Sequence, residues 1–333
     1  MSGLTELADS NVMERLEEYR TELTAYCYRM LGSSFEAEDA VQDTFVRAWR
    51  SFEGFEGRSS LRSWLYRIAT NVCLTMLGAS QRRARPMDLA GPSTADTPLP
   101  APLPETTWVE PMPDARMLPA DGDPAELAVT RDSVRLAFIA ALQHLPPRQR
   151  AVLILREVLR WRADEVAELL DTTVASVNSA LQRARATLGS LDVDEGEQVA
   201  TLDDEHRALL QRYLDAFESY DMDALTALLH EDAVWSMPPH ALWLHTNDDI
   251  RRWCLGPGIA CRDSRLIPIE ANGLPGFAQY KPASDGSGHD AWSLQIVEIA
   301  GDRISGITFF LDTERFFPLF GLPLHLDDEV RGL

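Results

Sequence analysis

A run of prolines divides the chain. Ten of its 20 prolines lie between Pro86 and Pro124, in a stretch with seven acidic residues and the single basic residue Arg116. Proline fixes the backbone, and so polar a stretch has little apolar surface to bury. We therefore expect an extended, acidic linker at 86–125. A weaker acidic break at Asp192–Asp204 predicts three folded blocks at 11–85, 126–190 and 205–325, which suits a chain of 333 residues.

Charge is distributed unevenly along the chain. The formal net charge is −21, and most of it falls after residue 190. An acidic protein is repelled by DNA unless its charges are segregated or a partner brings it there. Residues 58–85 contain no acid, and they interleave Trp64 and Tyr66 with six arginines: Arg58, Arg62, Arg67, Arg82, Arg83 and Arg85. This pattern is typical of sites that hold unpaired bases, so we expect nucleic acid to bind the first half.

Composition excludes several classes of protein. No apolar run approaches the roughly 20 residues of a membrane helix, and the N-terminus lacks the cationic start of a signal peptide. We expect a cytoplasmic protein without a membrane partner. The four cysteines form no Cys-x-x-Cys pair and have no zinc-finger spacing. We therefore expect free thiols, no metal and no cofactor.

The first block has a helical pattern. Apolar residues recur every three or four positions from Val12 to Met30 and stop at Gly32, a natural C-cap. A second helix follows at 36–50, and a third begins near Ser60. An acidic ridge of Glu36, Asp39 and Asp43 lies on the second helix and is either a binding surface or a solvated helix face. The loop between the second and third helices exposes Phe52 and Phe55 among glycines.

The second block has the pattern of a DNA-binding helix-turn-helix. Helices are expected at 134–145, 148–159, 164–170 and 174–188, with Pro146 and Pro147 between the first two. In the last helix we expect a buried stripe of Val174, Val177, Leu181, Ala184 and Leu188. The opposite face carries short polar and basic groups suited to a major groove.

The third block has the pattern of an α+β domain. Two helices near 209–217 and 221–229 precede strand-like runs at 233–237, 266–271, 277–281, 291–299 and 303–311. Helices followed by a meander suit a curved sheet wrapped on helices, the cone of the SnoaL/NTF2-like fold. A candidate ligand pocket at its mouth comprises Trp235, Met237, His240, Trp243, Tyr280 and Trp292, with His245 near the rim. The alternative is that these are core aromatics and surface histidines. Asp232, His240 and Asp312 are conceivable acid–base residues, but only by analogy of fold. The apolar tail Phe316–Leu324 is expected to dock on the helical domains or on the cone mouth.

Four motifs resemble one known family. They are EAEDAVQDTFVRAW at 36–49, SLRSWLYRIATN at 60–71, LPPRQR at 145–150 and the stretch Asp164–Arg185. In their order, and with the linker between them, they are similar to regions 2 and 4 of bacterial extracytoplasmic-function (ECF) sigma factors of the sigma-70 family. The third block and the tail resemble the SigG-like group, which has a C-terminal SnoaL-like domain. The expected fold is multidomain, with two all-α sigma domains and an α+β SnoaL/NTF2-like cone.

The resemblance implies a role for each block. Core RNA polymerase (beta-prime clamp and beta flap) and promoter DNA would be the partners, and the linker would enter the RNA exit channel. The implied polymerase-binding residues are Asp39, Gln42, Asp43, Phe45 and Trp49. The residues implied for the −10 element, where a flipped base is captured, are Phe52, Phe55, Arg58, Ser60, Arg62, Trp64, Arg67, Asn71, Arg82 and Arg83. Those implied for the −35 element are Arg148, Ser176, Asn178, Ser179, Gln182, Arg183 and Arg185.

One departure concerns the −35 element. Many relatives carry basic residues where this chain has Asn178 and Ala180. Either −35 recognition is weaker here or Asn178 reads adenine. The resemblance implies a sigma factor and not an enzyme. Its C-terminal domain would regulate it in cis and could bind a small molecule. The alternative is a ligand-sensing helix-turn-helix regulator, or an NTF2-like enzyme, fused to a DNA-binding region.

Overall fold

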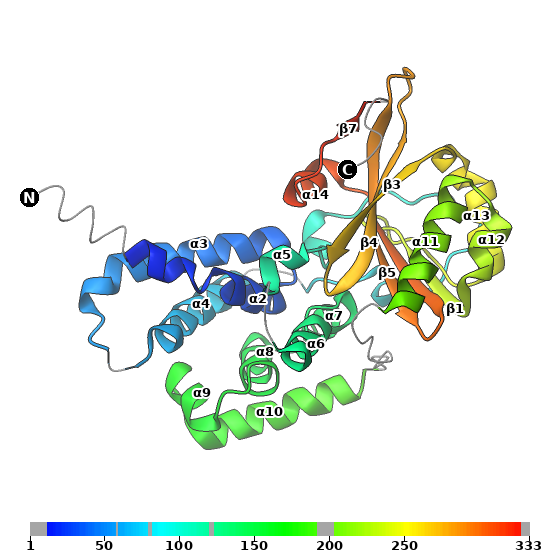
Figure 1. Cartoon of the computed structure of the whole chain (residues 1–333). Coiled ribbons are helices and arrows are strands. Elements are labelled where there is room, and N and C mark those ends of the chain that lie inside the picture. Colours follow the sequence, from blue (N-terminus) through cyan, green and yellow to red (C-terminus); the bar gives the residue numbers. More distant parts are fainter. Residues whose placement is uncertain (1–11, 58, 79–81, 120–122, 192–202, 328–333) are drawn as a thin grey trace, which may run out of the picture. The chain divides into compact units, whose positions relative to one another are not determined.

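A computed structural model describes residues 12–57, 59–78, 82–119, 123–191 and 203–327. The chain forms two compact units (Figure 1). One unit consists of Met1–Arg83 and Asp114–Val193, and it holds both helical blocks. The other consists of Ala84–Pro113 and Asp194–Leu333, so it holds the third block together with most of the proline-rich segment.

The first block is a bundle of α2 (Arg20–Leu31), α3 (Ser34–Ser51) and α4 (Leu61–Leu77), preceded by a helical stretch at 12–17. The single helix predicted from Val12 to Met30 is wrong, because a turn at residues 18–19 interrupts it. The predicted C-cap is confirmed: Gly32 has a φ of 72°, a left-handed conformation that glycine adopts without strain. Ser33 and Ser60 cap α3 and α4 with their side chains.

The second block contains the predicted helix-turn-helix. Its elements are α6 (Pro124–Asp132), α7 (Leu136–Leu142), α8 (Pro147–Leu153), a π-helical turn (Ile154–Val158), α9 (Ala163–Leu169) and α10 (Val174–Gly189), and a short α5 (Asp114–Met117) precedes them. Thr173 caps α10 with its side chain. Val177, Leu181 and Ala184 are buried, whereas Val174 is 42 % exposed. The prediction for Val174 is wrong because this residue is the first of α10, one turn before the buried residues of the helix begin at Val177.

Two buried arginines join the helical blocks within their unit. Arg29 of α2 donates to the main-chain oxygen and the hydroxyl of Ser133. Arg150 of α8 donates to the main-chain oxygen of Met30 and to the side-chain oxygen of Gln143, 2.7 Å away. These acceptors are all neutral oxygens. Burial lowers the pKa of each arginine to about 10, because a charged guanidinium loses its water there.

The third block is a seven-stranded sheet in the order β2-β1-β6-β5-β4-β3, with β7 paired to β5. The strands are β1 (Leu229–Ser236), β2 (Trp243–Leu244), β3 (Arg265–Ala271), β4 (Leu274–Pro282), β5 (His289–Ala300), β6 (Arg303–Phe310) and β7 (His325–Leu326). The helices are α11 (Asp204–Glu218), α12 (Met222–Ala227), α13 (Asn247–Leu255) and α14 (Thr313–Leu319). The α+β prediction and its five long strands are confirmed. The sequence did not predict β2, β7, α13 or α14.

The two faces of this sheet are covered differently. The main core lies between the sheet and α11–α13, around Tyr213, Phe217 and Trp235. On the opposite side lies α14, whose Phe316 and Phe317 are buried (Figure 1). Phe317 packs edge-on against Tyr280, with ring centroids 5.2 Å apart. The apolar tail therefore docks on the sheet of its own unit.

The proline-rich segment differs from the expectation of an extended, unburied linker. Residues 84–113 form no long helix or strand, as their prolines require. They nevertheless belong to the unit of the third block, and Ala95, Trp108, Val109 and Met112 are buried. The prediction failed because these few apolar residues pack on the surface of the third block and do not need to form a separate core.

Within the described ranges, no helix is long and apolar enough to cross a bilayer. All four cysteines fall in those ranges and are free. The same residues contain no group of three or more histidine, cysteine or carboxylate side chains that could hold a metal ion.

Candidate polymerase-binding and nucleic-acid-binding surfaces

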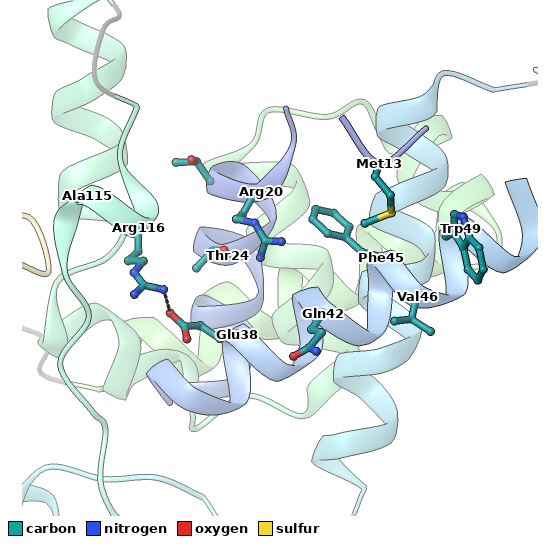
Figure 2. Close-up of a pocket in the computed structure, with 11 residues that line it drawn as sticks. Met13, Arg20, Thr24, Glu38, Gln42, Phe45, Val46, Trp49, Ala115 and Arg116 are labelled. Carbon is teal, nitrogen blue, oxygen red and sulfur yellow. Dashed lines mark hydrogen bonds and ion pairs between the residues drawn. The ribbon is translucent and has the colours of Figure 1, made fainter. Parts of the chain in front are cut away.

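A groove of about 580 Å³ runs along α3 in the first unit (Figure 2). Gln42, Phe45 and Trp49 line it together, because positions three and four apart share a helix face. The other lining residues were not predicted from the sequence and are Met13, Arg20, Thr21, Thr24, Glu38, Val46, Ala115 and Arg116. The three-and-four spacing could have identified Glu38 and Val46. Arg20, Ala115 and Arg116 come from other elements, which the spacing within α3 does not reveal.

The groove combines an apolar floor with a charged rim. Phe45 is 3 % exposed and lies 4.9 Å below the guanidinium of Arg20, whereas Val46 and Trp49 are 38 % and 44 % exposed. At the other end Arg116 forms an ion pair with Glu38. Exposed apolar residues gathered in this way are typical of a protein-binding surface.

Two predicted polymerase-binding residues do not line the groove. Asp39 is exposed on a neighbouring stripe of α3, and Asp43 forms an ion pair with Arg47 one turn along, 2.7 Å between Nη2 and Oδ2. The acidic ridge and the groove are therefore two adjacent faces of one helix. Glu36, the third acid of the ridge, pairs with Arg83 at 2.9 Å.

An aromatic cluster forms where α3 ends and α4 begins. The ring of Trp64 lies 4.9 Å from that of Phe55 and 6.2 Å from that of Phe52. All three residues are half-buried. The structure thus brings together the aromatic residues predicted for the −10 element. Ser60, from the same set, accepts a hydrogen bond from the amide of Ser63 and caps α4.

Several basic residues of the −10 set already have protein partners. Arg62 forms an ion pair with Glu22, 2.7 Å between Nη2 and Oε2, and its guanidinium lies 5.6 Å from the ring of Trp161 in the second block. Arg67 donates to the main-chain oxygen of Glu168 at 2.8 Å. The second block therefore occupies part of the surface predicted to bind the −10 element.

Arg83 was predicted to contact the −10 element, and its surroundings in the structure do not agree with that prediction. It is buried and neutralised by Glu36, so its charge is not presented to DNA. Arg82 is exposed and lies 2.9 Å from the ring nitrogen Nδ1 of His144. Asn71 is exposed on α4. Arg58 lies outside the described residues.

The predicted −35 residues are all exposed. Ser176, Asn178, Ser179, Gln182 and Arg183 are all exposed along α10, and so is Arg148 at the start of α8. Arg185 is also exposed and forms an ion pair with Glu157 at 2.6 Å. Thr173 fixes the start of the helix by accepting a hydrogen bond from the amide of Ser176. This face can enter a major groove with its N-terminal residues toward base edges.

The six residues of the predicted ligand pocket do not come together, and that prediction is wrong. Trp235 and Met237 belong to the main core, whereas Tyr280 donates to the main-chain oxygen of Pro323 on the α14 side. Trp292 stacks under Lys281, 3.5 Å from Nζ to the ring centroid. The remaining two, His240 and Trp243, hydrogen-bond to the proline-rich segment. The sequence pattern of these strands does not show on which face of the sheet each of these side chains lies.

A cavity of about 290 Å³ exists elsewhere in the second unit. Its walls combine the third block with the proline-rich segment and are formed by Pro102, Leu103, Glu105, Trp108, Val109, Glu110, Pro238, Pro239, Phe310, Asp312, Arg315 and Phe316. Arg315 pairs there with Glu105 at 3.0 Å, Glu110 at 3.1 Å and Asp312 at 3.4 Å. Burial by itself lowers the pKa of Arg315, but the neighbouring carboxylates, Glu110 first among them, outweigh it and raise that pKa.

The conceivable acid–base residues are separated. Asp232 is exposed beside His230, His240 binds the main chain of Pro100, and Asp312 pairs with Arg315. Inside the third block a buried network runs from Tyr213 through Gln295 and Gln279 to Ser264. Its groups are neutral hydroxyls and amides, and burial raises the pKa of Tyr213 well above its usual value.

Three family models match the three blocks. Sigma-70 region 2 matches residues 16–83, sigma-70 region 4 matches 135–188, and the SnoaL-like domain matches 210–307. The crystal structure of the sigma factor SigJ of Mycobacterium tuberculosis has the same fold, with a TM-score of 0.58 at 21 % identity over 94 % of this chain and 99 % of that one.

Sequence relatives agree with these matches. The ECF RNA polymerase sigma factor SigG of Mycobacterium tuberculosis (strain ATCC 25618 / H37Rv) is 46 % identical over 312 residues, covering 92 % of this chain and 82 % of that protein. SigW of Bacillus subtilis (strain 168) is 29 % identical over 51 % of this chain and 82 % of its own length. The chain belongs to the ECF family of RNA polymerase sigma factors, in a form that carries a C-terminal SnoaL-like domain.

Proposed function

We propose that this sigma factor binds core RNA polymerase through the groove along α3 and reads promoters with two separate regions. Region 2, at residues 11–85, melts and holds the −10 element with the aromatic cluster of Phe52, Phe55 and Trp64. Region 4, at 126–190, reads the −35 element with the exposed face of α10. The SnoaL-like domain at 205–325 regulates both in cis.

The observation that carries the polymerase assignment is the exposed apolar end of the groove. Val46 and Trp49 protrude from the same helix that carries the sigma-type motif at 36–49. Exposed apolar side chains that gather in one groove, rather than lying singly on the surface, are typical of a protein-binding site. The acids Asp39 and Asp43 on the adjacent stripe favour a partner with a basic rim.

The −10 assignment is supported by residue chemistry. Bases stack on aromatic rings with about 1–3 kcal/mol per base, and the rings of Phe52, Phe55 and Trp64 are half-buried, with part of their surface open to such contact. Arg62, Arg67 and Arg82 lie on α4 or just beyond it and supply phosphate contacts once their present partners are exchanged for DNA.

Cis regulation is supported by the position of the proline-rich segment. This segment connects region 2 to region 4 in the sequence, yet it belongs to the unit of the SnoaL-like domain. The domain thereby holds the connection between the two promoter-reading regions. No catalytic step is assigned to it, since its candidate acid–base residues lie in different surroundings.

A pair of matched valine variants tests the polymerase surface. Val46→Asp places a charge in the groove, whereas Val129→Asp places one on the similarly exposed face of α6, where Val129 is 46 % exposed. We expect Val46→Asp to weaken binding to core polymerase at least tenfold and Val129→Asp to leave it unchanged, as measured by fluorescence anisotropy of labelled protein. Equal binding by both variants would refute the assignment of the groove.

A further inference from the structure

The helical stretch at 12–17 contributes to two surfaces. Leu16 is fully buried and holds the stretch against the helical bundle. Met13 lines the groove along α3, together with Trp49 (Figure 2). Arg15 is exposed and does not line that groove. Because residues two apart on a helix point to different sides, this short helix presents Met13 to the groove and Arg15 to the neighbouring surface.

The guanidinium of Arg15 extends the aromatic cluster at the end of α3. It lies over the ring of Phe52, with 5.5 Å between Cζ and the ring centroid. The ring of Phe52 in turn lies 6.1 Å from that of Phe55 and 6.2 Å from that of Trp64. A cation over the face of a ring is attracted by the negative charge of that face, but only weakly at an exposed site. The ring therefore positions Arg15 without burying or neutralising its charge.

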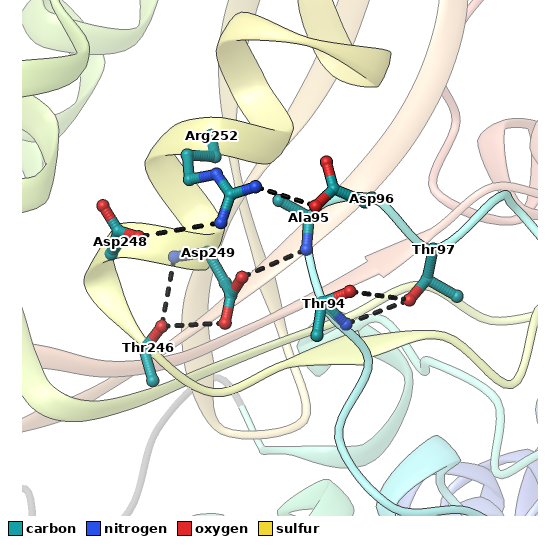
Figure 3. A network of polar contacts seen from close by, with 8 residues as sticks. All are labelled: Thr94, Ala95, Asp96, Thr97, Thr246, Asp248, Asp249 and Arg252. Carbon is teal, nitrogen blue, oxygen red and sulfur yellow. Dashed lines mark hydrogen bonds and ion pairs between the residues drawn. The ribbon is translucent and has the colours of Figure 1, made fainter.

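The charge of Arg15 is not balanced by a carboxylate. Other exposed arginines of the chain form ion pairs, and Arg252 of α13, for example, pairs with Asp96 at 2.8 Å (Figure 3). In region 2, Arg47 pairs with Asp43. Arg15 forms no ion pair with any residue of the described ranges. Its guanidinium can therefore bind an anion without first giving up a carboxylate partner.

The surroundings of the aromatic cluster require such a cation. The loop that carries the two phenylalanines also carries Glu53 and Glu56, which are both exposed. Acids this close repel a phosphate strand. On α4, Arg62 is already paired with Glu22. Among the residues that the structure describes, Arg15 is the one whose guanidinium lies over a ring of the cluster, so it supplies the positive charge that the loop itself does not provide.

We propose that Arg15 is a strand-binding residue of the −10 site, and that its guanidinium contacts a phosphate of the single strand whose bases stack on the aromatic cluster. Sites for unpaired bases combine ring platforms with cations that follow the backbone. Here the ring of Phe52 and the cation come from different segments of the chain that are in contact. A contact with the backbone adds affinity without selecting a base. This inference rests on the proposed function, because it adds a residue to the −10 site proposed there.

The test uses the full-length chain in complex with core polymerase, because a partner in the groove contacts the same short helix that carries Arg15. Affinity for a labelled single-stranded −10 oligonucleotide is measured by fluorescence anisotropy at several salt concentrations. Arg15→Gln removes the charge, and Arg15→Lys keeps it. Arg50→Gln is the matched control. Arg50 is exposed at the end of α3 and, within the described ranges, forms neither an ion pair nor a contact with an aromatic ring.

We expect Arg15→Gln to weaken binding about fivefold or more at low salt and to lower the log–log salt slope by about 0.7, the value for one phosphate contact on a single strand. Arg15→Lys should keep most of the affinity, since lysine binds phosphate as a point charge. Arg50→Gln should bind like the wild type. An unchanged affinity for Arg15→Gln would overturn the inference, and so would an equal loss for Arg50→Gln.

A different result would concern the proposed function itself. If the wild-type complex binds the oligonucleotide no better than core polymerase alone, the −10 site fails and the inference fails with it. If the wild-type complex binds and only the predicted loss for Arg15→Gln is missing, the −10 site stands and the inference alone is overturned.

Chemical footprinting of the wild-type chain decides the case in which Arg15→Gln misfolds, as shown by a lowered melting temperature. Phenylglyoxal modifies exposed arginines, and mass spectrometry gives the rate at each position. In the complex with polymerase, the oligonucleotide should slow the modification of Arg15 several-fold and leave that of Arg50 unchanged. Equal rates at Arg15 with and without the oligonucleotide would overturn the inference.

Discussion

Arg29 of region 2 donates to the hydroxyl of Ser133 in region 4, with 2.6 Å between Nη2 and Oγ. The guanidinium is buried, and the partners that receive its hydrogen bonds are neutral oxygens. A buried charge without a carboxylate partner contributes little net stability. Such a contact fixes the position of region 2 relative to region 4 within their unit.

Ser133→Ala should destabilise the helical unit by about 1.5–3 kcal/mol, the range for a hydrogen bond to a charged group. Ser190→Ala is the matched control. Both hydroxyls donate to a main-chain oxygen three residues back, at 2.6 and 2.7 Å, but Ser190 is exposed at a helix end. Urea unfolding measures both variants. Equal, small losses would show that the bond to Arg29 adds nothing.

Glu22→Gln should increase affinity for a single-stranded −10 oligonucleotide several-fold. The change frees Arg62 from its 2.7 Å ion pair, and one added phosphate contact steepens the salt dependence by about 0.7 in log–log slope. The ion pair is partly exposed, so stability should fall by about 1 kcal/mol or less.

Glu17→Gln controls for the change in charge, since Glu17 pairs with Arg20 away from α4. Binding is measured by fluorescence anisotropy at several salt concentrations. If the two variants gain affinity equally, general charge rather than release of Arg62 is responsible.

Asn178→Ala and Arg148→Ala should affect −35 binding in different ways. Asn178 is exposed on the recognition helix, and loss of a bidentate base contact should cost about 1–3 kcal/mol and relax specificity at one position. Arg148 is exposed at the start of α8. Its loss should weaken binding to all sequences alike and lower the salt slope by about 1. Binding to a set of single-base operator variants distinguishes these outcomes, and a uniform loss for Asn178→Ala would rule out base reading.

Docking of the C-terminal tail should depend on pH through His325. Its Nδ1 lies 2.8 Å from Asp290, and this hydrogen bond raises the pKa of His325 above 6.5. A raised folded-state pKa means that the stabilisation is complete below about pH 6.5 and is lost as the pH rises through the raised value. Residues 320–327 should therefore resist proteolysis better at pH 6 than at pH 8.

His325→Gln should abolish that difference, whereas His230→Gln, on the exposed part of β1, should preserve it. Limited digestion at matched protease activity measures the effect. A pH difference that survives in His325→Gln would assign it to another group.

The sequence predicted elements whose signals are local. Gly32 marked the end of α2, and short strand-like runs marked β3–β6, because a helix cap and a short run of strand-forming residues depend on a few neighbouring residues. For the cap and the strands, local chemistry and spacing were sufficient. The motif at 36–49 also identified Gln42, Phe45 and Trp49 by resemblance, and the structure places them on one helix face.

Features that depend on distant contacts were not predicted. Arg83 is of a residue type that commonly contacts phosphate, but it is buried against Glu36. The predicted pocket residues Trp243 and His240 instead form hydrogen bonds with the linker. The linker itself looked unable to fold because its few apolar residues are scattered. Trp108 and Met112 are buried only because the third block supplies a surface for them, and no local pattern encodes that surface.

Run-off transcription with core RNA polymerase on genomic DNA fragments tests the central claim most directly. The account predicts specific transcripts that appear only when the full-length chain is added, with start sites that share two upstream elements. Stable binding of the chain alone to duplex operators, without binding to polymerase and without such transcripts, would contradict it. That result would support a ligand-sensing helix-turn-helix regulator instead.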